Sequence, residues 1–216
     1  MKHFLVQNKI FFLLYAAFLV VGAVLIATME RGNEILFFNS LHNPLSDSFF
    51  KYITRLAEFP LLLLGLVMAV RFSYGKGLIL SINMLLVFGL TTFLKHVVFE
   101  QQIRPSIFFE GKVTLNFIEG LEILKYNSFP SGHTAGAFGM FCMLSILLHN
   151  KKWSYLFFTL ALLVGISRVY LLQHFFRDVY AGSLVGVVVS SVFYLTFVRT
   201  GWYGNLAWKD KALLKK

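Results

Sequence analysis

Long uncharged apolar stretches, separated by shorter polar segments, dominate the pattern of this chain. The first covers residues 10–29, and roughly 20 helical residues at about 1.5 Å each are enough to cross a hydrocarbon core of about 30 Å. Similar apolar stretches, three of which carry charged residues near one end, cover residues 77–96, 132–148, 153–171 and 176–198. A further stretch, residues 47–70, begins with apolar and polar positions at helical spacing and then becomes fully apolar. The pattern predicts an all-α membrane protein with six transmembrane helices in a bundle.

The polar segments between these helices differ in length. Residues 29–46 are polar and rich in turn-forming residues, so we expect a turn there, with Ser46 or Asp47 capping the second helix. We expect Pro60 to kink that helix. Residues 99–129 form a long extracytoplasmic loop that contains pairs of apolar residues, which predicts that it lies against the membrane surface. Loops of this length are usually functional or disordered.

The composition agrees with a membrane protein. Hydrophobic residues make up 57% of the 216 residues, compared with roughly 45–50% in soluble domains. The single cysteine, Cys142, lies in an apolar run, so an intrachain disulfide and a cluster of cysteine metal ligands are both excluded. We find no sign of a second domain and treat residues 1–216 as one membrane domain.

The net charge of +10 is distributed unevenly. Six spans place both termini on one side together with the loops 71–76 and 149–152, and this side carries eleven lysines and arginines against one acid, Asp210. The other side holds nine basic and nine acidic residues. Because an excess of lysine and arginine marks the cytoplasmic side, both termini are predicted to be cytoplasmic. The positive charge is therefore explained by topology, and we do not expect nucleic-acid binding.

The predicted alternation of spans gathers polar residues at the outer face. Three cations, two histidines and one acid meet there, which indicates an anion site: Lys95, Arg104, His133, Arg168, His174 and Asp178. Each also has an ordinary explanation, such as a lysine extending to the interface or an i, i+4 surface pair. Their convergence on one face favours a functional site.

Residues 130–133, Pro-Ser-Gly-His, open a predicted helix after a polar loop. The amides at a helix N-terminus bind phosphate readily, and Gly132 lets a ligand approach the backbone. Arg168 adds a planar donor fork, and Lys95 adds a compact positive charge.

His174 and Asp178 are spaced one helical turn apart. The carboxylate is then able to accept one ring N–H and fix the tautomer, which leaves the other nitrogen for nucleophilic attack. His133 is suited to protonate a leaving oxygen.

Two of these segments resemble signature motifs of the type 2 phosphatidic acid phosphatase (PAP2) superfamily. Residues 130–133 resemble the second motif, and Ser-Arg at 167–168 with His174 and Asp178 resembles the third. The first motif of the family is Lys, six residues, Arg-Pro. Here eight residues separate Lys95 from Arg104, and Val97 stands where the family has its lysine.

The resemblance implies a metal-independent phosphatase that acts through a phosphohistidine and needs no cofactor. His174 would be the nucleophile, Asp178 would orient it, and His133 would be the general acid. The resemblance implies that the phosphate is held by Lys95, Arg104, Ser131, Gly132 and Arg168.

The compact six-span form is similar to the bacterial lipid phosphatases, which implies a multi-pass protein of the bacterial plasma membrane with its site facing outward. The partners implied are the bilayer and a lipid phosphate. Undecaprenyl diphosphate is the first candidate, with phosphatidylglycerol phosphate, phosphatidic acid and lipid A phosphates as alternatives. A lipid phosphotransferase and a non-catalytic anion-binding protein are the alternatives of another class. The sequence does not indicate an oligomeric state.

Overall fold

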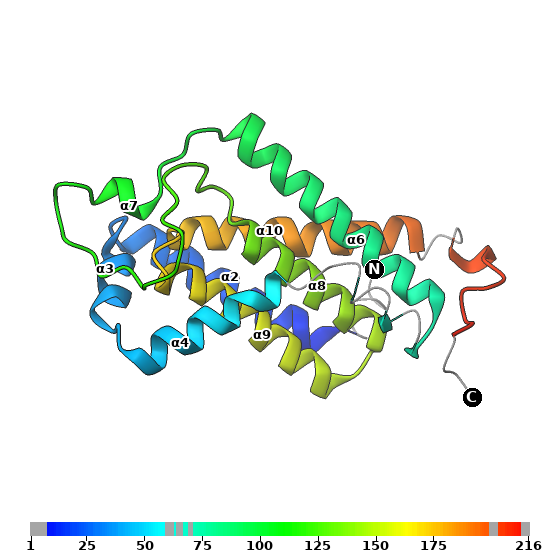
Figure 1. The fold of residues 1–216 in the computed structure, drawn as a ribbon. Coiled ribbons are helices and arrows are strands. Elements are labelled where there is room, and N and C mark those ends of the chain that lie inside the picture. The colour runs from blue at the N-terminus through cyan, green and yellow to red at the C-terminus, as the bar shows by residue number, and fades with distance from the viewer. Residues whose placement is uncertain (1–7, 59–62, 64–66, 69–70, 199–202, 213–216) are drawn as a thin grey trace.

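A computed structural model describes residues 8–58, 63, 67–68, 71–198 and 203–212. Within these ranges every regular element is helical, which confirms the all-α prediction. The α-helices, shown in Figure 1, are α2 (Lys9–Thr28), α3 (Asn33–Ser40), α4 (Pro44–Ile53), α6 (Tyr74–Phe93), α7 (Pro105–Phe108), α8 (Gly132–Leu148), α9 (Lys151–Tyr170) and α10 (Phe176–Phe193). The shorter elements are η1 (Thr54–Ala57), η2 (Leu94–Val98), η3 (Tyr194–Val198) and η4 (Tyr203–Asn205).

Four helices in the described ranges are long and apolar enough to cross a membrane. They are Lys9–Thr28, Tyr74–Val98, Lys151–Tyr170 and Phe176–Val198, where the second and fourth include the π-helical turns η2 and η3. Helix α8 is apolar but shorter, with 17 residues. Of the second predicted span, 47–70, the structure describes α4 and η1, whereas Pro60 lies outside the described residues. The chain is thus a multi-pass membrane protein.

The segment 29–46 contains a helix that the turn pattern did not predict. Helix α3 begins after Gly32, whose φ of 102° lies in the left-handed region. Its Ile35 is fully buried against the end of α9 and the start of α10. The predicted cap of the next helix was wrong, because the N-cap of α4 is Asn43, whose side chain accepts the Ser46 N–H at 3.0 Å.

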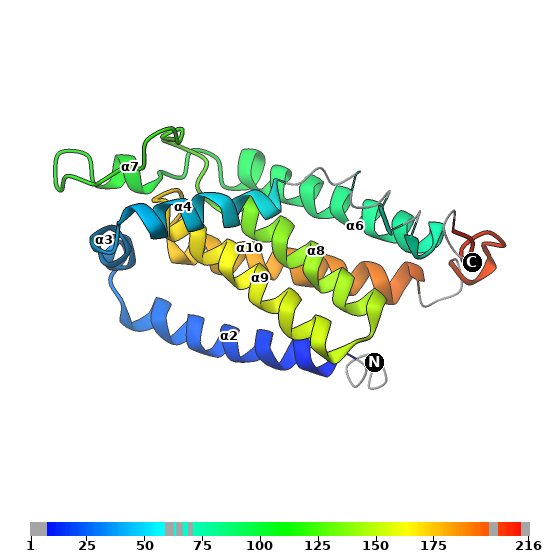
Figure 2. The ribbon, with the colours of Figure 1, turned by 60° about the horizontal axis from the view of Figure 1, so that its bottom comes forward.

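Helix α8 occupies the centre of the bundle and packs most closely on α10 (Figure 2). Two glycines of α10, Gly182 and Gly186, are four residues apart and face α8. A Cβ at Gly182 would lie 2.5 Å from the Ser131 carbonyl oxygen, and one at Gly186 would lie 2.4 Å from the Ala135 oxygen. Small residues at this spacing let helix backbones approach closely in membranes. They hold the start of α8 beside the start of α10.

The loop between η2 and α8 folds over one end of the bundle, the end at which α3 also lies (Figure 1). Its Phe109 and Leu115 join a buried cluster with Ile35 and Phe175. The Asn116 N–H donates to the Asn39 side chain at 2.9 Å. The loop therefore has defined packing on α3 and on the turn between α9 and α10, and it closes this end of the helices. The start of α2 and η4 lie at the opposite end (Figure 2).

Candidate active site

The eight residues singled out in the sequence come from elements that meet at the end of the bundle covered by the loop. They lie on η2, on the loop, on the first turn of α8, at the end of α9, in the α9–α10 turn and on the first turn of α10. Three of the charged side chains are buried there, with Arg104, Arg168 and Asp178 at most 6% exposed. Burying charge is costly unless the groups are paired or bind a ligand.

His174 lies in the turn between α9 and α10, and Asp178 follows in the first turn of α10. The His174 N–H donates to the Arg168 carbonyl at 3.1 Å, which fixes the turn. Asp178 is the third residue of α10, and its Oδ2 accepts the Phe175 N–H at 3.1 Å. The turn still brings the pair together, with His174 Nδ1 3.6 Å from Asp178 Oδ2.

Ser128 completes this pair and was missed by the sequence analysis. Its hydroxyl donates to Asp178 Oδ2 at 2.5 Å and lies 3.5 Å from His174 Nδ1. Its backbone N–H donates to the Gln102 carbonyl at 2.9 Å, which joins the last part of the loop to its first part. The only signal in the sequence is a small polar residue two positions before Pro130. Ser128 holds the carboxylate and the imidazole in one buried arrangement.

Arg104 joins the loop to the turn that carries His174. Its Nε donates to the Tyr126 carbonyl at 2.8 Å, and its Nη1 donates to the Gln173 carbonyl at 2.8 Å. Its Nη2 donates to the Asn127 carbonyl at 3.3 Å. The same Nη1 lies 3.4 Å from His174 Nε2. Arg104 therefore supplies positive charge next to the imidazole while its donors hold backbone carbonyls.

Arg168 contributes a buried donor at the same end of the bundle. Its Nη1 donates to Thr54 Oγ1 at 2.7 Å, so the buried Thr54 hydroxyl has a partner. Its Nε is buried and makes no hydrogen bond with the residues that the structure describes. Because an unsatisfied buried donor is costly, this nitrogen favours an anionic oxygen as its partner.

Ser131 and Gly132 begin α8 beside this cluster. The Ser131 N–H donates to the Asp178 carbonyl at 3.0 Å, and its hydroxyl accepts from Thr134 Oγ1 at 2.9 Å. Ser131 thus links the starts of α8 and α10. Gly132 faces Lys95, because a Cβ built on Gly132 would lie 3.8 Å from Lys95 Nζ.

Lys95 lies in the π-helical turn η2 and points into a groove of about 420 Å³ between α6 and α8. The groove is lined at its polar end by Lys95, Gly132 and His133, and deeper by apolar side chains that include Met84 and Val87. A π-helical turn accommodates an extra residue in a helix and is frequent at functional sites. Lys95 therefore reaches the start of α8 despite its unusual distance from Arg104 along the chain.

Glu58 is a second residue that the sequence analysis did not place in the site. Its Oε1 lies 3.0 Å from His133 Nε2, and both residues line the groove that contains Lys95. The sequence showed Glu58 only as part of the polar face of the second helix. Its position beside His133 depends on how η1 packs against α8.

The electrostatics of the site favour a neutral imidazole. Burial, and then the positive charges of Arg104 and Arg168, lower the pKa of His174 well below its usual value. Neutral histidine keeps the lone pair that a nucleophile needs. Burial also lowers the pKa of Arg104 to about 10, so its guanidinium is still charged at neutral pH.

The described helices thus define a membrane bundle with a buried imidazole–carboxylate pair and basic groups at one end. The chain belongs to the PAP2 superfamily, whose sequence pattern matches residues 76–202, more than half of its length.

Three relatives match over most of the chain. The lipid A 4'-phosphatase of Porphyromonas gingivalis is 27% identical over 83% of this chain and 78% of the relative. The crystal structure of Aquifex aeolicus LpxE has a TM-score of 0.63 at 31% identity and covers 75% of this chain and 93% of that one. The crystal structure of a phosphatidylglycerolphosphate phosphatase from Bacillus subtilis has a TM-score of 0.53 at 25% identity. The match covers 95% of this chain and 98% of that one. The chain spans less than a third of the length of the first curated relatives that it matches.

Proposed function

We propose that this protein is a lipid phosphate phosphatase that works through a phosphohistidine intermediate on His174. The observation that carries the proposal is the buried pair of His174 Nδ1 and Asp178 Oδ2, 3.6 Å apart, with Arg104 Nη1 3.4 Å from the other ring nitrogen. This arrangement combines a neutral nucleophile with positive charge where phosphate oxygens would lie. Membership of the PAP2 superfamily supports the same assignment.

In the proposed mechanism the Nε2 lone pair of His174 attacks phosphorus, and the bond from phosphorus to the lipid oxygen breaks. His133 donates a proton to that leaving oxygen. Water then attacks the phosphohistidine, His133 takes up a proton from the water, and inorganic phosphate leaves. Asp178 orients the imidazole and stabilises its positive charge. Lys95, Arg104 and Arg168, with the start of α8 at Ser131 and Gly132, stabilise charge on the equatorial oxygens.

We further propose that residues 1–216 form a single six-span domain in the bacterial plasma membrane. Both termini lie in the cytoplasm, and the site faces outward. The unequal charge counts of the two sides support this orientation. The start of α2 and η4 lie at the end of the bundle opposite the site, as an even number of spans requires (Figure 2).

The groove between α6 and α8 supports a substrate with an apolar tail. Its polar end holds Lys95 and His133, and its walls are apolar, so a lipid tail fits there while the phosphate lies beside the catalytic groups. Undecaprenyl diphosphate is our first candidate. Lipid A phosphate, phosphatidylglycerol phosphate and phosphatidic acid are the alternatives, and the names of the relatives in Porphyromonas gingivalis and Bacillus subtilis support the first two of these.

The test is a substrate panel with these four lipids, purified protein in detergent, EDTA in the buffer and inorganic phosphate as the readout. We expect release from at least one lipid and complete loss in His174→Ala. The matched control is His149→Ala, because His149 lies in the turn between α8 and α9, outside the site. An active His174→Ala variant contradicts the mechanism. A phosphorylated acceptor in place of free phosphate indicates a phosphotransferase, and binding without turnover indicates a non-catalytic protein.

A further inference from the structure

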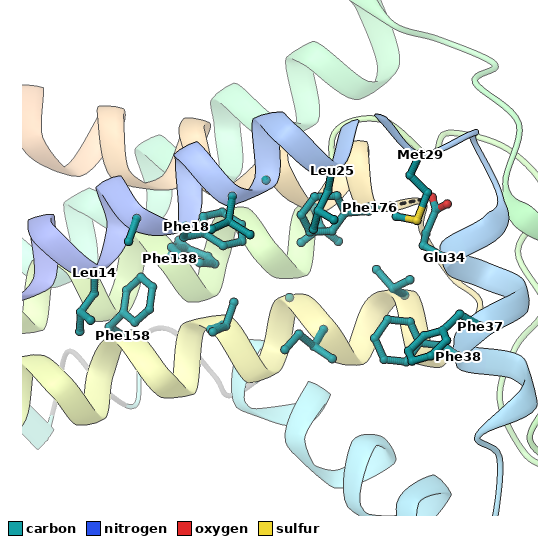
Figure 3. Close-up of a pocket in the computed structure, with 18 residues that line it drawn as sticks. Leu14, Phe18, Leu25, Met29, Glu34, Phe37, Phe38, Phe138, Phe158 and Phe176 are labelled. Carbon is teal, nitrogen blue, oxygen red and sulfur yellow. Dashed lines mark hydrogen bonds between the residues drawn. The ribbon is translucent and has the colours of Figure 1, made fainter. Parts of the chain in front are cut away.

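A second groove, of about 570 Å³, runs between α2 and the pair α9 and α10. It shares no lining residue with the groove that contains Lys95. Figure 3 shows Leu14 and Phe158 towards one end, Phe18 and Phe138 in the middle, and Glu34 at the other end. Apart from Glu34, every residue that lines it is a glycine or has an apolar side chain. The proposed catalysis does not use this groove.

The groove has the length of a lipid chain. Its lining positions on α2 and the C-cap of α2 extend from Leu14 to Met29, a length of about 22 Å at the rise of a helix. Half of a hydrocarbon core is about 15 Å thick, so an acyl chain of one leaflet fits along this wall. Because α2 crosses the membrane, a groove on its surface is filled by lipid and not by water.

One end of the groove opens to two cations. Leu25, Met29, Glu34 and Phe176 also border an adjoining cavity of about 190 Å³, whose lining adds Arg31 and Arg177. The apolar groove and the two arginines are therefore continuous. Their arrangement matches an amphiphile with its anionic group at the end of α2.

The arginines have unused hydrogen-bonding capacity. The guanidinium of Arg31 lies 4.1 Å from the centre of the Phe175 ring, and its Nε is buried. Arg177 Nε is also buried and lies 3.6 Å from Asp178 Oδ1. Neither Nε makes a hydrogen bond with the residues that the structure describes. Such donors favour an anionic oxygen as a ligand.

The acid in this cavity, Glu34, is already satisfied by the backbone. Its Oε2 accepts the Gly32 N–H at 2.8 Å, and its Oε1 accepts the Phe176 N–H at 3.2 Å. Glu34 thus fixes α3 to the start of α10. Arg177 is paired with Asp178, and the Glu34 carboxylate is bonded to the backbone. Arg31 makes no ion pair with a carboxylate among the described residues, so its positive charge is the one left for a ligand.

We infer that this groove binds an anionic glycerophospholipid of the bilayer, with an acyl chain along α2 and its phosphate at Arg31 and Arg177. The site lies on the other side of α8 from the groove assigned to the substrate, and its ligand is a lipid that is bound and not hydrolysed. The inference does not depend on the proposed function, because it concerns binding alone.

The test measures lipids that stay bound to the protein. Purified protein is reconstituted in nanodiscs with equal amounts of phosphatidylglycerol and phosphatidylcholine, released into detergent, and examined by native mass spectrometry. We expect phosphatidylglycerol to be retained roughly tenfold over phosphatidylcholine, as a charge-assisted contact predicts. Arg31→Gln should abolish this preference. Lys125→Gln is the matched control, because Lys125 is an exposed loop cation that lines neither cavity.

A second pair of variants tests the apolar groove. Ala17 lines it and Ala16 does not, although both are exposed on α2. Ala17→Trp should lose the retained lipid, and Ala16→Trp should keep it. Val21→Trp and Val20→Trp repeat the comparison one turn along the helix, in case one variant fails to fold.

Equal retention of the two lipids by the unaltered protein overturns the inference. Equal retention by Ala17→Trp and Ala16→Trp also overturns it. Phosphate release, measured on the same samples, separates the two proposals, because a protein that binds phosphatidylglycerol without hydrolysing any lipid contradicts only the proposed function.

Discussion

Replacing Ser128 by alanine tests whether the buried pair of His174 and Asp178 acts as described. The substitution removes the hydroxyl that donates to Asp178 Oδ2 at 2.5 Å and leaves the Phe175 N–H as the partner of that oxygen at 3.1 Å. Both Ser128 and Asp178 are fully buried, so water cannot easily take the place of the lost donor. The carboxylate would then hold the imidazole less firmly.

The expected magnitude follows from the charge on the acceptor. A hydrogen bond to a charged group contributes about 1.5–3 kcal/mol. If this contribution acts in the transition state, kcat/KM falls by roughly 10- to 150-fold, since each 1.36 kcal/mol is a factor of ten. The assay is phosphate release from the best lipid of the panel, with thermal unfolding measured in parallel to exclude a folding defect.

Ser106→Ala is the matched control, because the Ser106 hydroxyl donates to the Leu124 carbonyl at 2.7 Å in the same loop but away from His174. It should leave kcat/KM unchanged. In an Asp178→Asn background, Ser128→Ala should cost much less than in the unaltered protein, since the two residues act as a unit. Equal activity of Ser128→Ala and Ser106→Ala would refute the role of Ser128.

Three further predictions concern the cations, the pH dependence and the packing. Lys95→Ala should lower the rate of phosphate release more than about tenfold, because it removes a charge that stabilises the transition state. The control Lys125→Ala should leave the rate unchanged. A near-normal rate for Lys95→Ala would show that Lys95 does not act in the site. Because burial lowers the pKa of His174, its neutral form persists below the ordinary pKa of about 6.5. We therefore expect kcat/KM to fall only at more acidic pH. A loss of kcat/KM above a pH of about 6.5 that is assigned to His174 would contradict this. Gly186→Ala should destabilise the protein by about 1–3 kcal/mol through contact with α8, measured by unfolding in detergent. Gly89→Ala, whose Cβ meets no atom within 4 Å among the described residues outside its own helix backbone and chain neighbours, should be tolerated. Equal stability of the two variants would argue against close packing of α8 on α10.

The local pattern of apolar and polar residues is enough to predict some of the helices. The apolar stretch predicted at 132–148 is α8, Gly132–Leu148, because a capping serine precedes it and a polar turn ends it. Helix α3 did not follow, because its four apolar residues, 35–38, are consecutive and show no helical spacing, and the burial of Ile35 depends on the α9–α10 turn. Short helices of this kind are stabilised by tertiary packing rather than by propensity.

The sequence by itself determined the class of protein, the apolar helices and the charged residues that alternating spans bring to one end. The spacing of its motifs also indicated the family. The tertiary structure alone decided which of these residues meet: His174 contacts Asp178 through a turn, Ser128 joins them from a distant loop, and Glu58 reaches His133. These contacts depend on backbone turns and on the packing of helices that are far apart in the chain, and neither is encoded in a local periodicity.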